Sequence, residues 1–163
     1  ANIGVYTMWA KLNNVRQVYS FEPNPVLVND MRHTFANDKN VAIFDHPISN
    51  KDEEDVFYIS TQSVSSGFYK TNGTEYKVQK INLENFSNKN NLLKPTIIKC
   101  DIEGSEMAAI TDETVAAVKD IVDCWFIEVH QTEQGMTWEN SLRKNKKIIS
   151  IDVEKNLTNL QLH

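Results

Sequence analysis

Two acidic residues and a glycine come directly after a short apolar run, in the segment TIIKCDIEGSE that spans Thr96–Glu106. Strand-forming residues dominate Thr96–Lys99, and a helix carrying Met107–Ile110 can follow. This order of strand, acidic turn and helix is one half of a βαβ crossover, and open parallel sheets bind ligands outside the carboxyl ends of their strands. The pattern therefore predicts that Asp101 and Glu103 lie at a binding site, where a carboxylate can orient a hydroxyl group and accept its proton.

A second acid follows another apolar strand. Val18–Phe21 is expected to form a short strand that ends at Glu22, and Pro25 is expected to begin the next helix. A carboxylate at such a strand end can accept two hydrogen bonds from a ribose diol, as in dinucleotide-binding folds. The alternative is that Glu22 caps the Pro25 helix.

A third polar pair closes the strand Cys124–Val129, namely Glu128 and His130. If the strand geometry continues, both side chains share one face, and a histidine that titrates near neutrality suits general-base work. The alternative is an ordinary loop histidine. With Asp101 and Glu103 these residues could form an oxygen-rich Mg²⁺ site. The sequence favours the alternative, in which the site holds no metal.

The residues that flank the acids are interpreted structurally. Lys99 is expected to point away from the side of the strand that Cys100 occupies, and to be solvated or packed against a helix rather than catalytic. Ser105 and Glu106 are expected to cap the following helix and to complement its dipole.

The rest of the chain alternates between strand and helix patterns, which predicts an α/β fold with a mostly parallel sheet. Further elements are expected as follows: a helix over Val5–Leu12, a strand over Val41–Phe44, a polar loop over Ser49–Asp55, a strand over Val56–Ile59, a mobile loop over Thr61–Thr74, an edge strand over Tyr76–Ile81, one helical turn over Leu83–Phe86, a helix from a cap at Asp112 through Val118, and an antiparallel hairpin of Ile148–Val153 with Leu157–Leu162.

Composition limits the classes of function. The 163 residues suit one domain, and a net charge of −5 argues against nucleic acid as the main partner. No apolar run is long enough to span a membrane, so no membrane partner is expected. Cys100 and Cys124, the two cysteines, fall inside apolar strands, which is typical of core residues in a reducing cytoplasm.

Three segments, in this order and at these separations, resemble the FkbM family of S-adenosylmethionine-dependent methyltransferases: VYSFEPNP, IIKCDIEGSE and WFIEVH, which begin at Val18, Ile97 and Trp125. The resemblance implies a Rossmann-like fold, a mostly parallel sheet with helices on both faces, and S-adenosylmethionine as the cofactor. It also implies an O-methyltransferase acting on a hydroxyl of a sugar or secondary metabolite, so the expected partner is a small-molecule or glycan acceptor.

The resemblance assigns roles to individual residues. Asn2 and Gly4 look like the end of a turn whose backbone lies against the cofactor, and Glu22 is the ribose-binding acid. Asp101 either binds the methionine amino group of the cofactor or acts as the base. Glu103 and His130 are further catalytic candidates.

The chain departs from the family at its beginning. Family members carry a strand and a DxG-like turn before the segment that corresponds to Ala1–Gly4, whereas this sequence starts at Ala1. We therefore expect a single domain over residues 1–163 that is N-terminally truncated, binds the cofactor weakly or not at all, and can form a homo-oligomer by strand pairing.

Two other classes of function stay open on the sequence. The missing turn favours a non-catalytic Rossmann-like fragment or interaction module. The spacing of Gly4 and Glu22 is close to a nicotinamide-binding fingerprint, although the acidic turn at Asp101 disfavours an oxidoreductase.

Overall fold

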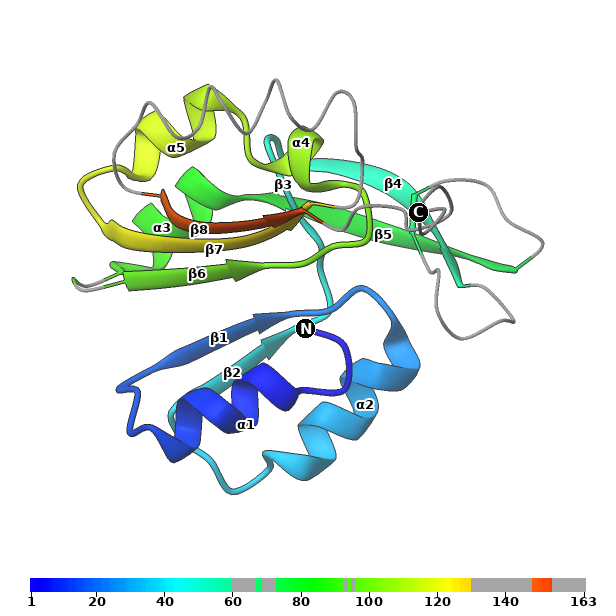
Figure 1. Ribbon diagram of the computed structural model, residues 1–163. Coiled ribbons are helices and arrows are strands. Elements are labelled where there is room, and N and C mark those ends of the chain that lie inside the picture. The colour runs from blue at the N-terminus through cyan, green and yellow to red at the C-terminus, as the bar shows by residue number, and fades with distance from the viewer. Residues whose placement is uncertain (60–66, 69–72, 93, 95, 130–147, 154–163) are drawn as a thin grey trace, which may run out of the picture. The chain divides into compact units, whose positions relative to one another are not determined.

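The computed structural model describes residues 1–59, 67–68, 73–92, 94, 96–129 and 148–153. Both helices and strands occur along the whole described chain, with parallel strand pairs among them, which confirms the α/β class (Figure 1). The chain forms two compact units, 1–81 and 82–163. Within the described residues no helix is long and apolar enough to cross a membrane.

The first unit contains a parallel pair of strands, β1 (Val18–Phe21) and β2 (Val41–Phe44). Helix α1 (Val5–Leu12) contacts β1, and helix α2 (Pro25–Thr34) contacts β2 (Figure 1). The predicted bounds of α1, β1 and β2 and the predicted start of α2 are confirmed. Each of these elements ends at a turn-forming or helix-starting residue, so local signals suffice to delimit it.

Helix α2 begins as its sequence predicts. Pro25 occupies the first turn, where its missing N–H has no intrahelical partner to lose. The Asn24 side chain accepts a hydrogen bond of 3.0 Å from the N–H of Val26 and so caps the helix. The buried face of this segment carries Val28, Met31 and Phe35, which form part of the core.

A second sheet in the first unit has the strand order β3 (Ile48–Ser49), β5 (Thr74–Asn82) and β4 (Glu53–Ile59). The prediction that Tyr76–Ile81 forms an edge strand is wrong, because β5 lies between two partners. Its alternating pattern reflects one buried and one solvated face rather than an unpaired edge.

Strand β4 begins within the predicted polar loop, at Glu53 rather than at Val56. Glu53 and Asp55 lie opposite Lys80 and Val78 of β5, and the Lys80 ammonium forms ion pairs with both carboxylates. The cation also lies 4.5 Å from the centre of the Phe68 ring. Cross-strand charge pairing therefore extends a strand through residues that by type favour a loop.

The second unit contains the parallel strands β6 (Thr96–Cys100), β7 (Val122–Val129) and β8 (Ile148–Val153), with β7 in the centre. Its helices are α3 (Leu83–Asn90), α4 (Glu106–Ala109) and α5 (Asp112–Val118). Helix α3 contacts α5, and α4 contacts β7. The core of this unit includes Ile110, Val118, Val122, Trp125 and Ile127.

The fold prediction is confirmed only at the level of class. The described strands form three small sheets, of which the β1–β2 pair and the β6–β7–β8 sheet are parallel and the β4–β5 pairing is antiparallel. A single mostly parallel sheet is therefore not shown. Strand β8 runs parallel to β7, and Leu157–Leu162, the other half of the predicted hairpin, lies outside the described residues. The predicted loop over Thr61–Thr74 also falls mostly outside them.

The length of one helix and the cap of another differ from expectation. Helix α3 runs for two turns rather than one, and the Asn82 side chain caps it by accepting a 2.9 Å hydrogen bond from the N–H of Asn85. Helix α5 is capped by Thr111, whose hydroxyl accepts a 3.2 Å hydrogen bond from the N–H of Thr114, and not by Asp112. Asp112 instead lies in the first turn, where its charge favours the helix dipole.

Both cysteines are buried with free thiols, as predicted. Burial, reinforced by the nearby Glu106 carboxylate, raises the pKa of the Cys100 thiol well above its usual value. Burial also raises the pKa of Cys124. Both side chains therefore act as small apolar core residues rather than as nucleophiles.

The Thr111 cap can be tested by substitution. Thr111→Val removes the hydroxyl and keeps the side-chain shape, and we expect it to lower the free energy of unfolding by about 1 kcal/mol. Thr111→Ser keeps the hydroxyl and should retain most of that stability. Urea titrations of both variants measure the difference, and equal stabilities would contradict the capping role.

Candidate functional site

The carboxyl ends of β1 and β2 place two acids at the same end of a parallel sheet. Phe21 and Phe44 are paired in register, and the N–H of Glu22 donates a 3.0 Å hydrogen bond to the carbonyl of Phe44. Asp45 follows Phe44 directly, so Glu22 and Asp45 stand on neighbouring strand ends. The sequence reasoning missed Asp45, although VAIFD has the same strand-then-acid pattern as VYSFE.

The Glu22 carboxylate accepts hydrogen bonds from the backbone N–H groups of Asn2 and Asn24 and from the ammonium group of Ala1. Oε2 lies 2.7 Å from the nitrogen of Asn2 and 3.1 Å from that of Ala1, and Oε1 lies 2.9 Å from the nitrogen of Asn24. The residue is only 7% exposed. Glu22 therefore fastens the turn that precedes α1 to the end of β1, and the structure brings together Asn2, Gly4 and Glu22, the three predicted cofactor-binding residues of the first unit.

The turn before α1 depends on residues that tolerate left-handed backbone. Asn2 has φ 53°, and Gly4, the N-cap residue of α1, has φ 86°. A Cβ on Gly4 would lie 3.0 Å from Cε2 of Phe35 and 3.4 Å from Met31, so a side chain there would be both strained and crowded. The glycine thus allows the turn to pack closely on α2.

Asp45 presents a negative charge at this strand end. Its carboxylate lies 3.3 Å from Arg32 and 3.4 Å from His46, and its side chain is half exposed. Burial by itself raises the pKa of Asp45, but hydrogen bonds from its own backbone N–H and from Arg32, with the positive charge of Arg32, bring that pKa below its usual value. The group is therefore ionised near neutral pH and can accept hydrogen bonds from a ligand.

In the second unit, the acidic turn after β6 is held by a buried carboxylate. Glu103 and Gly104 both have positive φ, 53° and 94°. Oε1 of Glu106 accepts hydrogen bonds from the N–H groups of Ile102, at 3.0 Å, and Gly104, at 3.2 Å, and Glu106 is 1% exposed. Ser105 occupies the N-cap position of α4 and Glu106 lies in its first turn, as predicted, but the Ser105 side chain makes no capping hydrogen bond. The Glu106 side chain instead folds back and accepts hydrogen bonds from the N–H groups of the turn.

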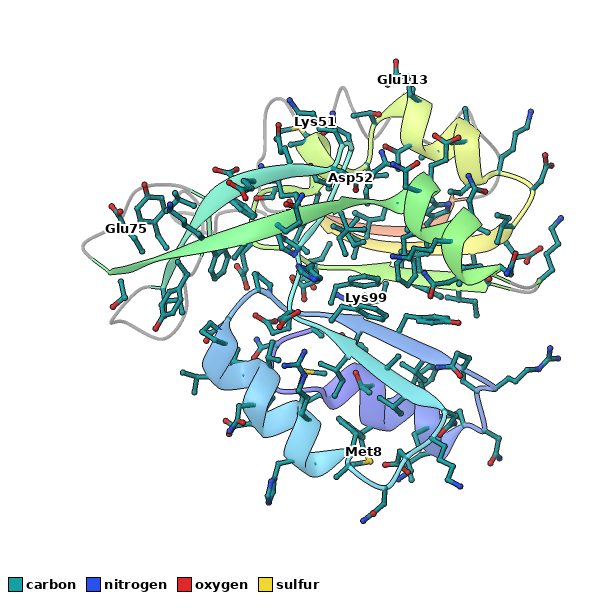
Figure 2. All side chains as sticks on the ribbon, turned by 180° about the vertical axis from the view of Figure 1, so that it is seen from behind. Met8, Lys51, Asp52, Glu75, Lys99 and Glu113 are labelled. Carbon is teal, nitrogen blue, oxygen red and sulfur yellow. The ribbon has the colours of Figure 1, made fainter. Side chains whose placement is uncertain are left out.

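The turn displays Asp101 beside a lysine and a second acid. Nζ of Lys99 lies 3.0 Å from Oδ2 of Asp101 and 3.5 Å from Oε2 of Glu128. Figure 2 labels Lys99, which comes from β6. The prediction that Lys99 is solvated is wrong, because its ammonium nitrogen is buried and lies between the Asp101 and Glu128 carboxylates. Lys99, Asp101 and Glu128 come together because β6 and β7 pair in this register, and no local sequence pattern indicates that register.

The two other predicted site residues of this unit are Glu103 and His130. Glu103 is exposed in the turn that follows β6, two residues after Asp101. His130 lies outside the described residues. Among the residues that the structure describes, no three His, Cys, Asp or Glu side chains are grouped so as to hold a metal ion.

The chain belongs to the FkbM methyltransferase family, because the sequence model of the methyltransferase FkbM domain matches residues 1–156. Searches of curated proteins and of solved structures found no match. The match includes each of the strand-end acids described above, and it confirms the family that the three segments resemble.

Gly4 provides a test of the first turn. We expect Gly4→Ala to lower the free energy of unfolding by about 1–3 kcal/mol, because it adds left-handed strain and a short contact with Phe35. Asn14, which also has positive φ, is the control: Asn14→Gly should be neutral or slightly stabilising. Urea unfolding measures both, and a Gly4→Ala variant as stable as wild type would refute this account of the turn.

Glu106 provides a test of the second turn. Glu106→Ala leaves two backbone N–H groups without their acceptor in a buried site, so we expect a loss of roughly 2–4 kcal/mol in the free energy of unfolding. Glu106→Gln keeps an acceptor oxygen and should lose less. The exposed Asp120 of the same unit serves as a control, since Asp120→Ala should stay within about 0.5 kcal/mol of wild type. A Glu106→Ala loss no larger than the control's would contradict the role of the carboxylate.

Proposed function

We propose that the protein is an S-adenosylmethionine-dependent O-methyltransferase that acts on a hydroxyl group of a sugar or secondary metabolite. The observation that carries the proposal is the family match over residues 1–156, which spans both compact units. The same match supports a single Rossmann-like methyltransferase domain. The free buried thiols Cys100 and Cys124 support a cytoplasmic location.

The first unit offers groups that fit the nucleoside of the cofactor. An ionised carboxylate has about four acceptor positions, and Glu22 uses two of them on the N–H groups of Asn2 and Asn24 and a third on the Ala1 ammonium. One position is left for a ribose hydroxyl, rather than the two hydrogen bonds expected from the sequence. Asp45 on the neighbouring strand end is half exposed and supplies further acceptors. The left-handed turn at Asn2 and Gly4 brings backbone close to the same strand end.

The second unit offers groups that fit the acceptor. When bound, S-adenosylmethionine supplies an electrophilic methyl group on a sulfonium. Asp101 is partly exposed and can orient an acceptor hydroxyl and take its proton as the oxygen attacks the methyl carbon. Glu103 at the tip of the turn is a second carboxylate for hydroxyl binding, and His130 remains an alternative base. Asp101 could instead bind the amino group of the cofactor.

One substitution separates the two roles of Asp101. If Asp101 is the base, Asp101→Asn should lower kcat at least about 100-fold while the dissociation constant of S-adenosylmethionine stays near that of wild type. If Asp101 binds the cofactor amino group, the dissociation constant should rise instead. Transfer of labelled methyl groups to a panel of hydroxylated glycans and metabolites measures the first quantity, and calorimetry measures the second. A wild-type protein that neither binds the cofactor nor transfers methyl groups would contradict the proposed function.

A second candidate is a non-catalytic module that keeps the family fold. The hydrogen bonds from the N–H groups of Asn2 and Asn24 to Glu22 favour it, because such a carboxylate has a sufficient structural role without a ligand. The two candidates differ in cofactor binding, so the same calorimetry decides between them.

A further inference from the structure

We propose that Lys99 is a positioning residue for methyl transfer, which holds the Asp101 carboxylate in place by bridging it to Glu128. This inference rests on the proposed function and adds a residue to which the sequence reasoning gave no part in the site. Its basis is the arrangement of the three charged groups at the carboxyl ends of β6 and β7.

The strand geometry brings the three side chains to one face of the sheet. Lys99 and Asp101 are two residues apart, so in extended backbone they point to the same side. Lys99 is paired in register with Phe126 of β7, and Glu128 lies two residues beyond Phe126. All three side chains therefore project from the same face near the same sheet end, and the distances of 3.0 and 3.5 Å from Nζ follow from this register.

The charge pattern gives Lys99 a specific task. Asp101 and Glu128 stand on adjacent strand ends and carry like charges, which repel when nothing lies between them. The Lys99 ammonium replaces this repulsion with two attractions and fixes the direction of the Asp101 carboxylate. A proton acceptor must be aligned with the acceptor hydroxyl, and small misplacements of catalytic groups are costly to the rate.

The exposure of the group differs between its members. The side chains of Asp101 and Glu128 are 32% and 36% exposed, so a ligand can reach the two carboxylates. The side chain of Lys99 is 25% exposed, but its ammonium nitrogen is buried. Removing the ammonium therefore acts on folding as well as on alignment, so the melting temperature of each variant is measured beside its rate.

The test compares four variants of the whole protein in methyl transfer to a hydroxyl acceptor. We expect Lys99→Met to lower kcat by about 100-fold with KM for the acceptor within about threefold of wild type, because alignment rather than binding is lost. Lys99→Arg keeps the positive charge and should restore most of the rate. Lys119→Met, at an exposed lysine just after α5, should leave kcat and KM unchanged.

The fourth variant tests the mechanism directly. In Lys99→Met with Glu128→Gln the repulsion of Asp101 is removed along with the bridge, so kcat should recover about tenfold over Lys99→Met alone, which is a coupling between the two sites. The proposal is overturned if Lys99→Met keeps the wild-type kcat, if Lys99→Arg is as slow as Lys99→Met, or if the double variant does not recover. If the wild-type protein transfers no methyl group to any acceptor, the proposed function itself is contradicted, and the role of Lys99 is contradicted as well.

Discussion

Backbone N–H groups in sharp turns are the constraint on which both groups of acids depend. The turn over Asn2–Gly4 and the turn at Glu103 and Gly104 contain residues with positive φ, and their N–H groups need acceptors. In each unit a buried carboxylate is the acceptor: Glu22, after β1, binds the turn that precedes α1, and Glu106 binds the turn that follows β6. These two acids are therefore part of the scaffold, and the more exposed acids Asp45 and Asp101 are the ones that we propose for ligand binding.

This difference between buried and exposed acids explains why the acids of the sequence motifs have different roles. Glu22 keeps roughly one acceptor position for a ligand, since an ionised carboxylate has about four. Glu106 is fully enclosed and acts only through the shape of the turn. Asp101 depends for its direction on a lysine that comes from the strand itself. The chemistry that we propose for the family fold therefore relies on carboxylates that bind backbone as much as on those that bind substrate.

Local sequence signals were enough to predict the helices and strands that begin and end at strong local cues. Asparagine, proline or acidic residues follow the ends of three such elements, and the structure has the predicted bounds for all three: Val5–Leu12, Val18–Phe21 and Val41–Phe44. The predictions were wrong where contacts with residues distant in the sequence determine the strand bounds and the strand order. Strand β4 extends to Glu53 because Lys80 pairs with its acids across the sheet, and β5 is central because β3 also pairs with it.

The site was predictable to a similar degree. The strand-end motifs pointed to Glu22 and Asp101, and the structure groups Asn2 and Gly4 with Glu22. The contacts of Lys99 could not be predicted, because they need the register of β6 against β7. The backbone partners of Glu22 and Glu106 were likewise invisible, since acids at these positions suit a cap or a ligand equally well by residue type.

Calorimetric titration of the whole protein with S-adenosylmethionine, for wild type and Glu22→Gln, tests most directly whether strand-end acids hold the cofactor. Asp30→Asn, an exposed acid on α2, is the matched control. The account predicts saturable binding by wild type and by the control, and about tenfold weaker binding by Glu22→Gln, since one hydrogen bond to a charged group is lost. Absence of binding by wild type, or equal affinity of Glu22→Gln and wild type, would contradict it.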